Sequence, residues 1–156
     1  MRNLSLIIIV FIVALRVAYA VDVANCSNPS GKSYFPFLGL MDKKDSGWSD
    51  DKISDGVITL TKNDANEYDL LYIDTTKRIT SSKADGGTVI FLRKGLNEAA
   101  FLVSYQNAIE IYTFIIDKSK NLEYTYTSNR FGDGVLIPKA TVMKGDCSFI
   151  NLDLIK

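Results

Sequence analysis

Three acidic residues in strand-like stretches, Asp69, Asp74 and Glu110, are the side chains of this sequence best suited to catalysis. Two carboxyl groups at a suitable separation can cleave a glycosidic bond without histidine. The chain has no histidine, which excludes a Ser–His–Asp triad, a Cys–His dyad and a His-ligated zinc site. Nothing in the spacing makes two acids converge, and acids on the polar face of strands are normally solvated. We therefore expect no enzyme, metal or cofactor, with a carboxylate-based hydrolase as an alternative.

The two cysteines, Cys26 and Cys147, lie near opposite ends of the chain that follows residue 20. A reactive thiol needs a neighbouring cation, a helix N-terminus or a CxxC partner, and the sequence contains no CxxC motif. Two cysteines allow one intramolecular pairing. We expect a disulfide that ties an N-terminal arm to the last strand. It closes a loop of about 120 residues, and chain-entropy arguments value this closure at about 4–5 kcal/mol.

Aromatic residues two positions apart occur in two consecutive apolar stretches, Tyr112 with Phe114 and Tyr124 with Tyr126. Residues two apart on a strand share a face, so pairing of the two stretches would align the four rings across the strands. Such a ladder is either ordinary sheet packing or a binding face for a ligand or partner. Trp48, in an acidic stretch, is predicted to be a lid over the core; the alternative is an exposed recognition residue.

Residues 1–20 have the form of a secretory signal peptide. Arg2 precedes an apolar stretch at 4–15, and Ala-Tyr-Ala at 18–20 matches a signal-peptidase site. The apolar stretch of about 12 residues is shorter than the roughly 20 that a membrane-spanning helix needs. An uncleaved anchor and a lipoprotein are the alternatives. We expect a periplasmic or secreted protein with a single β domain over residues 21–156.

Charge composition argues against two classes of partner. The whole chain has 18 basic and 18 acidic residues, and residues 1–20 hold two of the basic ones and no acid, which leaves 16 against 18. A nucleic-acid-binding protein normally shows a basic field, and attachment to anionic lipid needs basic clusters. We expect neither nucleic acid nor, after signal cleavage, stable membrane insertion.

The stretch 88–127 organises the predicted fold. Runs at 88–93, 99–105 and 108–117 are rich in β-branched and aromatic residues, are separated by short polar turns and are followed by a run at 122–127. This pattern is typical of an antiparallel meander. Further short strands are expected at 56–61, 67–74, 78–83, 135–137, 140–143 and 149–155. The spacing indicates an all-β sandwich or small barrel of roughly seven to nine strands.

The sequence also predicts how the meander is flanked. Residues 21–41 contain turn signals at Asn28-Pro29 and Gly39, which favour an irregular N-terminal arm. Both faces of 108–117 are apolar and should be partly covered, with the arm as the expected cover. Asp85-Gly86-Gly87 is the strongest hairpin signal in the chain.

Ser81-Ser82, Arg93-Lys94-Gly95 and Glu98-Ala99 together resemble the serine-rich hairpin and Lys-Gly turn of periplasmic C-type lysozyme inhibitors. The spacing departs from that family's pattern, and the aromatic-Thr pair before Lys-Gly is missing. The resemblance implies a small disulfide-bearing β-barrel that inserts a loop into an enzyme cleft. Ser82 and Lys94 would then be the contact residues of this inhibitory loop.

These observations favour an exported, non-catalytic small β protein that binds a small apolar ligand or a protein partner. The runner-up is a periplasmic inhibitor of a cell-wall hydrolase, and the carboxylate-based hydrolase is a further alternative. The residues do not specify the ligand, the partner or the oligomeric state.

Overall fold

The structure, a computed structural model, describes residues 20–73 and 77–156. The predicted signal peptide, residues 1–20, lies outside the described residues except for Ala20. No helix in the described part is both long and apolar enough to cross a bilayer.

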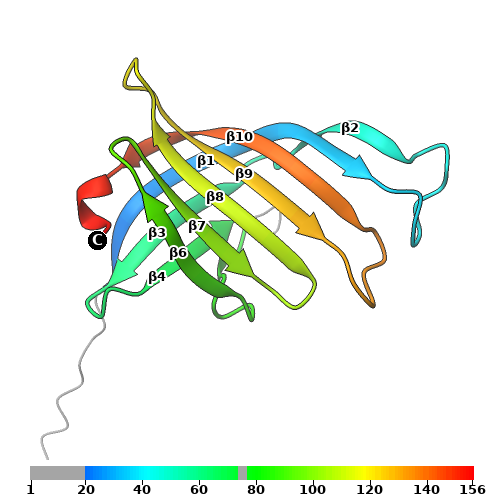
Figure 1. Cartoon of the computed structure of the whole chain (residues 1–156), viewed down its shortest axis with the longest axis horizontal. Coiled ribbons are helices and arrows are strands. Elements are labelled where there is room, and N and C mark those ends of the chain that lie inside the picture. Colours follow the sequence, from blue (N-terminus) through cyan, green and yellow to red (C-terminus); the bar gives the residue numbers. More distant parts are fainter. Residues whose placement is uncertain (1–19, 74–76) are drawn as a thin grey trace, which may run out of the picture.

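The described residues form ten β-strands and one short 3₁₀ helix. The strands are β1 (Ala20–Phe35), β2 (Gly47–Lys52), β3 (Val57–Asn63), β4 (Tyr68–Ile73), β5 (Ile79–Ser81), β6 (Thr88–Lys94), β7 (Glu98–Ser104), β8 (Ala108–Ile116), β9 (Leu122–Arg130) and β10 (Lys139–Ile150), and the helix is η1 (Leu152–Leu154). They make one antiparallel sheet in the order β5-β4-β3-β1-β10-β9-β8-β7-β6, with β2 off this path and paired with β1. The sheet curls until β3 and β4 face β6 and β7, which makes a half-barrel (Figure 1). The predicted all-β fold is therefore confirmed.

The central meander forms as its sequence predicts. Strands β6 to β9 pair in chain order, and each begins within one residue of its predicted start. Apolar runs with short polar breaks encode this part locally, because each strand needs only its neighbour in sequence as a partner.

The predicted irregular N-terminal arm is wrong. Residues 20–35 form the 16-residue strand β1, which pairs with β10 on one side and with β3 and then β2 on the other. The turn signal Asn28-Pro29 marks the change of partner, since pairing with β3 ends at Ser27 and pairing with β2 begins at Ser30. Asn28 has φ 52° and the register with β10 shifts there, so the two residues form a bulge, where proline is tolerated within a strand.

The predicted hairpin at Asp85-Gly86-Gly87 is also wrong. Strand β5 pairs with β4 and β6 pairs with β7, so this turn joins the two outer strands of the sheet path. Gly86 has φ 86°, a conformation that glycine adopts without steric cost. A Cβ on Gly87 would lie 2.8 Å from the Ser82 carbonyl oxygen and 2.8 Å from Tyr105 Cε1, so the second glycine permits close packing.

The C-terminal segment is more continuous than predicted. The expected strands at 140–143 and 149–155 are replaced by the single strand β10, and the chain then turns through η1. Pro138 is buried just before β10 begins, and the expected strand at 135–137 is a loop. A strand paired on both sides can continue through small polar residues that show no strand pattern of their own.

Aromatic rings fill the closed end of the half-barrel. Phe101 on β7 lies at ring-centroid distances of 5.0 Å from Tyr68, 5.4 Å from Phe91 and 6.1 Å from Phe114. Tyr68 belongs to β4 and Phe91 to β6, so their contact at 5.9 Å joins the two sides of the curled sheet. Ring packing, rather than hydrogen bonding, closes the half-barrel here.

The expected cover over the outer face of the meander is absent. Phe37 and Leu38 are 65% and 62% exposed, and Ile109 and Ile111 on the outer face of β8 are 41% and 37% exposed. Most of the residues expected to form the arm belong to β1 instead. The loop that follows β1 folds against Leu136, because the Leu40 backbone N–H donates a hydrogen bond to the Leu136 carbonyl oxygen.

The predicted disulfide is confirmed. Cys26 on β1 and Cys147 on β10 are directly opposite each other and bonded, 121 residues apart in sequence. The bond therefore joins two neighbouring strands in the middle of the sheet. Such bonds are typical of oxidising compartments, and the fold is consistent with an extracellular protein.

Candidate functional site

The concave side of the half-barrel holds a cavity of about 740 Å³. Side chains alternate along a strand, so residues two apart lead from the core into this cavity. On β8 the buried Phe114 is followed by Tyr112, Glu110 and Ala108, and the last three line the cavity. The wall therefore changes from apolar at the closed end to polar further out.

Five tyrosines line the cavity: Tyr72, Tyr105, Tyr112, Tyr124 and Tyr126. The predicted cross-strand ladder is present, with Tyr112 opposite Tyr126 and Phe114 opposite Tyr124. The ring centroids of these pairs are 5.1 Å and 6.3 Å apart. Phe114 is fully buried in the core, so the ladder is half core and half cavity wall.

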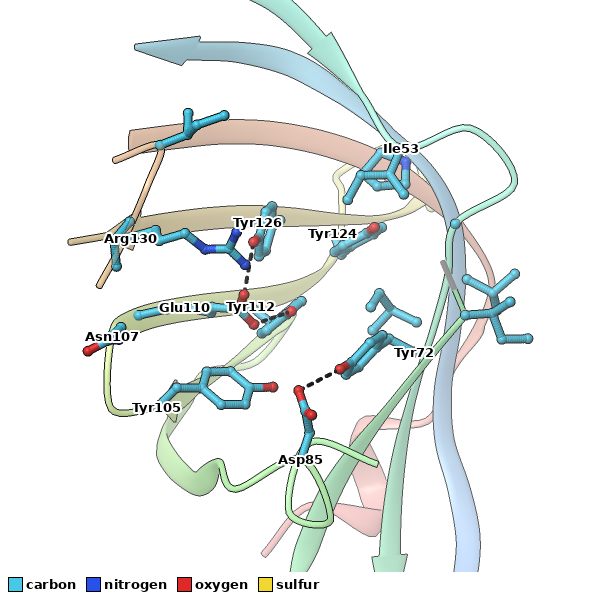
Figure 2. Close-up of a pocket in the computed structure, with 18 of the residues that line it drawn as sticks. Ile53, Tyr72, Asp85, Tyr105, Asn107, Glu110, Tyr112, Tyr124, Tyr126 and Arg130 are labelled. Carbon is cyan, nitrogen blue, oxygen red and sulfur yellow. Dashed lines mark hydrogen bonds between the residues drawn. The ribbon is translucent and has the colours of Figure 1, made fainter. Parts of the chain in front are cut away.

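Glu110 lies at the centre of the polar part of the cavity (Figure 2). Its carboxylate accepts hydrogen bonds from the hydroxyls of Tyr112 at 2.7 Å and Tyr126 at 3.0 Å. Burial raises the pKa of Glu110, while these two hydrogen bonds and the Arg130 guanidinium act in the opposite direction. Burial, and next the Glu110 charge, raise the pKa of Tyr112 well above its usual value, so its hydroxyl stays protonated as a donor.

A second carboxylate faces the same space from the turn between β5 and β6. Asp85 accepts a hydrogen bond from the Tyr72 hydroxyl at 2.8 Å. Figure 2 shows the Tyr105 hydroxyl pointing toward Asp85. Burial is the main reason that the pKa of Tyr105 is raised, and the charges of Glu110 and Asp85 add to it. The phenols therefore sit in a negative field.

Arg130 and a short apolar loop complete the wall. Arg130 extends from the end of β9, and its guanidinium lies beside Tyr126 and Glu110 (Figure 2). It is exposed, whereas Glu110 is half-buried. Val135, Leu136 and Ile137, in the loop before β10, contribute apolar surface to the cavity.

Tyr124 has a buried hydroxyl with no hydrogen-bond partner among the described residues. The ring packs flat against β10, where a Cβ on Gly145 would lie 2.5 Å from Tyr124 Cε1. Gly145 is the register partner of Tyr124, so the missing side chain makes room for the ring. Burial raises the pKa of Tyr124. An unpaired buried hydroxyl lowers stability by about 1–3 kcal/mol relative to a paired one.

Removing that hydroxyl should stabilise the protein. We expect Tyr124→Phe to raise the free energy of unfolding by about 1 kcal/mol, because the ring packing stays and the unpaired polar atom is gone. Urea denaturation followed by circular dichroism measures this change. Tyr34→Phe, at a side chain 41% exposed, is the matched control and should stay within about 0.5 kcal/mol. A less stable Tyr124→Phe would show that the hydroxyl contributes to the fold.

Of the three acids predicted as possible catalytic residues, the two that the structure describes, Asp69 and Glu110, do not face the same cavity. Asp69 lies on β4 between the buried Tyr68 and Leu70, and so faces the opposite side of the strand. Its carboxylate accepts hydrogen bonds from Ser81 Oγ and the Lys83 backbone N–H. Glu110 faces the cavity, and Asp74 lies outside the described residues.

Ser82 and Lys94, the contact residues implied by the inhibitor resemblance, do not together form an exposed loop. Ser82 is 1% exposed, so its side chain is not accessible to a partner. Lys94 donates from Nζ to the Ile155 carbonyl oxygen at 3.0 Å and thereby holds the C-terminal turn. Leu96, at the tip of the turn between β6 and β7, is 96% exposed.

The predicted lid role of Trp48 is wrong. Trp48 lies on β2, is 66% exposed and packs in a tilted arrangement against Tyr34 of β1, with ring centroids 5.5 Å apart. It does not line the cavity that holds Tyr112, Tyr124 and Tyr126. Because β2 lies off the main path of the sheet, its side chains have no core beneath them.

Sequence reasoning gave no site role to four of the polar residues that line the cavity: Tyr72, Asp85, Tyr105 and Arg130. Arg130 lies four residues after Tyr126, and Tyr105 lies two residues after Val103. Because side chains alternate between the two faces of a strand, this spacing could have predicted that both residues share a face with those neighbours. Asp85 carries no such signal, because it faces the cavity only through the turn that joins β5 to β6.

The polar side chains that line the cavity are five phenols, two carboxylates, one guanidinium and the amide of Asn107. In the described part of the chain, no group of three or more His, Cys, Asp or Glu side chains is placed to hold a metal ion. Comparisons of the chain with protein-family models, with curated proteins and with solved structures found no match.

Proposed function

We propose that this protein is an exported, non-catalytic binding protein whose half-barrel holds a small organic ligand in the tyrosine-lined cavity. The observation that carries the proposal is a cavity of about 740 Å³ with five inward tyrosines and a carboxylate held at its centre. Ligand sites in proteins typically have this size and combine apolar and aromatic walls with a few placed polar groups.

The signal-peptide pattern of residues 1–20 and the Cys26–Cys147 bond support export. Phenols suit a binding wall because each one offers a rigid apolar ring and a polar tip. An inhibitory loop has less support, because Ser82 is buried and Lys94 is engaged with the C-terminal turn.

Binding of the neutral, apolar dye Nile red tests the proposal. We expect fluorescence enhancement on titration with the wild type, and an affinity at least about tenfold weaker for Ala108→Trp, because an indole at this position would occupy the cavity. Ala65→Trp, at an exposed residue of the β3–β4 turn, is the matched control and should bind like the wild type.

Native mass spectrometry of the protein purified from its source adds a second measurement. We expect a mass excess from a co-purified small molecule that disappears under denaturing conditions. A clean mass together with no dye uptake would refute the proposal, as would equal dye binding by wild type and Ala108→Trp.

A further inference from the structure

The side chains that line the cavity carry more negative than positive charge. Glu110 and Asp85 line it with two carboxylates, whereas Arg130 is the one cationic side chain among the described lining residues. Arg130 reaches from the end of β9 to lie beside Glu110 and offsets one of the two negative charges, so the lining keeps a net charge of −1; Asp85 is exposed and Glu110 is half-buried. A charged ligand group that reaches the half-buried part therefore meets a negative field.

Glu110 has unused capacity to accept hydrogen bonds. An ionised carboxylate offers about four lone-pair sites, and two are taken by the Tyr112 and Tyr126 hydroxyls. Those two donors stabilise the ionised form and fix its position, so it needs no rearrangement to receive a further donor. An ammonium group carries up to three N–H donors and a full positive charge, which match the remaining sites.

The tyrosine rings add a second attraction for a cation. The face of an aromatic ring is the negative end of its quadrupole, and cations bind over it within about 6 Å. Tyr112 and Tyr126 pack on each other, with ring centroids 5.1 Å apart, and both direct their hydroxyls to the Glu110 carboxylate (Figure 2). Tyr105 and Tyr72 face the same space with Asp85.

From this arrangement we propose that the cavity selects organic cations. A protonated amine would place its ammonium against Glu110 among the tyrosine rings, and its apolar body against Val135, Leu136 and Ile137. A cavity of about 740 Å³ accommodates a body considerably larger than the ammonium group. This inference rests on the proposed function and names the ligand class of the same site.

Three probes of similar shape and different charge test the selectivity: 2-phenylethylammonium, 2-phenylethanol and 3-phenylpropionate. Their affinities are measured at neutral pH by displacement of Nile red and by calorimetry. We expect the wild type to bind the ammonium at least about tenfold more tightly than the alcohol, because a hydrogen bond to a charged group is about twice as strong as a neutral one. The carboxylate probe should bind most weakly.

Variants identify the group responsible. Glu110→Gln keeps the shape and one acceptor oxygen but removes the charge, and it should reduce the preference for ammonium over alcohol to about twofold or less. Asp85→Asn should reduce it partly. Glu67→Gln removes the same charge from an exposed side chain that does not line this cavity, and it should retain the full preference.

The outcomes separate the two proposals. If Nile red binds and the three probes bind equally, or if 3-phenylpropionate binds best, selection of cations is refuted while a ligand-binding cavity stands. If the preference persists in Glu110→Gln, the assigned role of that carboxylate is refuted. If neither Nile red nor any probe binds, both proposals fail. The wild-type comparison needs no variant and so does not depend on how a substitution folds.

Discussion

Replacing both cysteines by alanine is expected to lower the free energy of unfolding by about 4–5 kcal/mol. The bond joins residues 121 apart in sequence, so reducing it frees nearly the whole described chain in the unfolded state. Single domains are stable by about 5–15 kcal/mol, so this loss removes about a quarter or more of the total. Equilibrium urea denaturation of Cys26→Ala/Cys147→Ala against the oxidised wild type measures it.

Wild-type protein held under reducing conditions is the control for this prediction. It carries the native side chains without the bond, so its unfolding midpoint should match that of the double variant. Cys26 is 1% exposed and Cys147 is half-buried. Comparing the reduced wild type with the double variant therefore separates the packing effect of alanine at these positions from the effect of the cross-link. A loss below about 1 kcal/mol would show that the paired strands already restrict the unfolded chain.

Phe101→Ala is expected to lower the free energy of unfolding by about 3–5 kcal/mol. Phe101 is fully buried and contacts three other rings. One of them, Tyr68, lies on β4 across the half-barrel, and another, Phe91, lies on the paired strand β6. Its removal leaves a cavity at the point where rings, not hydrogen bonds, join the two sides of the half-barrel. Urea or guanidinium denaturation measures the loss.

Phe37→Ala is the matched control for Phe101→Ala. It removes the same side chain from a residue that is 65% exposed, so the change in stability should stay within about 0.5 kcal/mol. Losses of similar size for the two variants would mean that the aromatic cluster does not hold the two sides together.

The cavity and the stability of the fold are related through Tyr124 and Glu110. An unpaired hydroxyl and a half-buried carboxylate both cost folding energy, and both line the cavity. A wall made only to fold would be more apolar. Polar groups kept at such a cost are typical of binding sites, and this supports the proposal that the cavity binds a ligand.

Local pattern was sufficient for the meander and the disulfide. The apolar runs of β6 to β9 need only short turns and neighbouring partners, and two cysteines allow one intramolecular bond. The pairing of Tyr112 with Tyr126 followed from the same alternation. Two expectations based on isolated turn signals failed, because Asn28-Pro29 became a bulge and Asp85-Gly86-Gly87 a connection between strands that do not pair.

By itself, the sequence determined an all-β chain with a central meander, one disulfide and aromatic residues that share a face, because these features depend on neighbours in the chain. Only the tertiary structure decided that β1 lies in the middle of the sheet and that Tyr72, Asp85 and Arg130 share a cavity with Glu110. The physical reason is that the curl of the sheet places β4 opposite β7 and β8. That curl arises from strand twist and ring packing summed over the whole sheet, so no short stretch of residues encodes it.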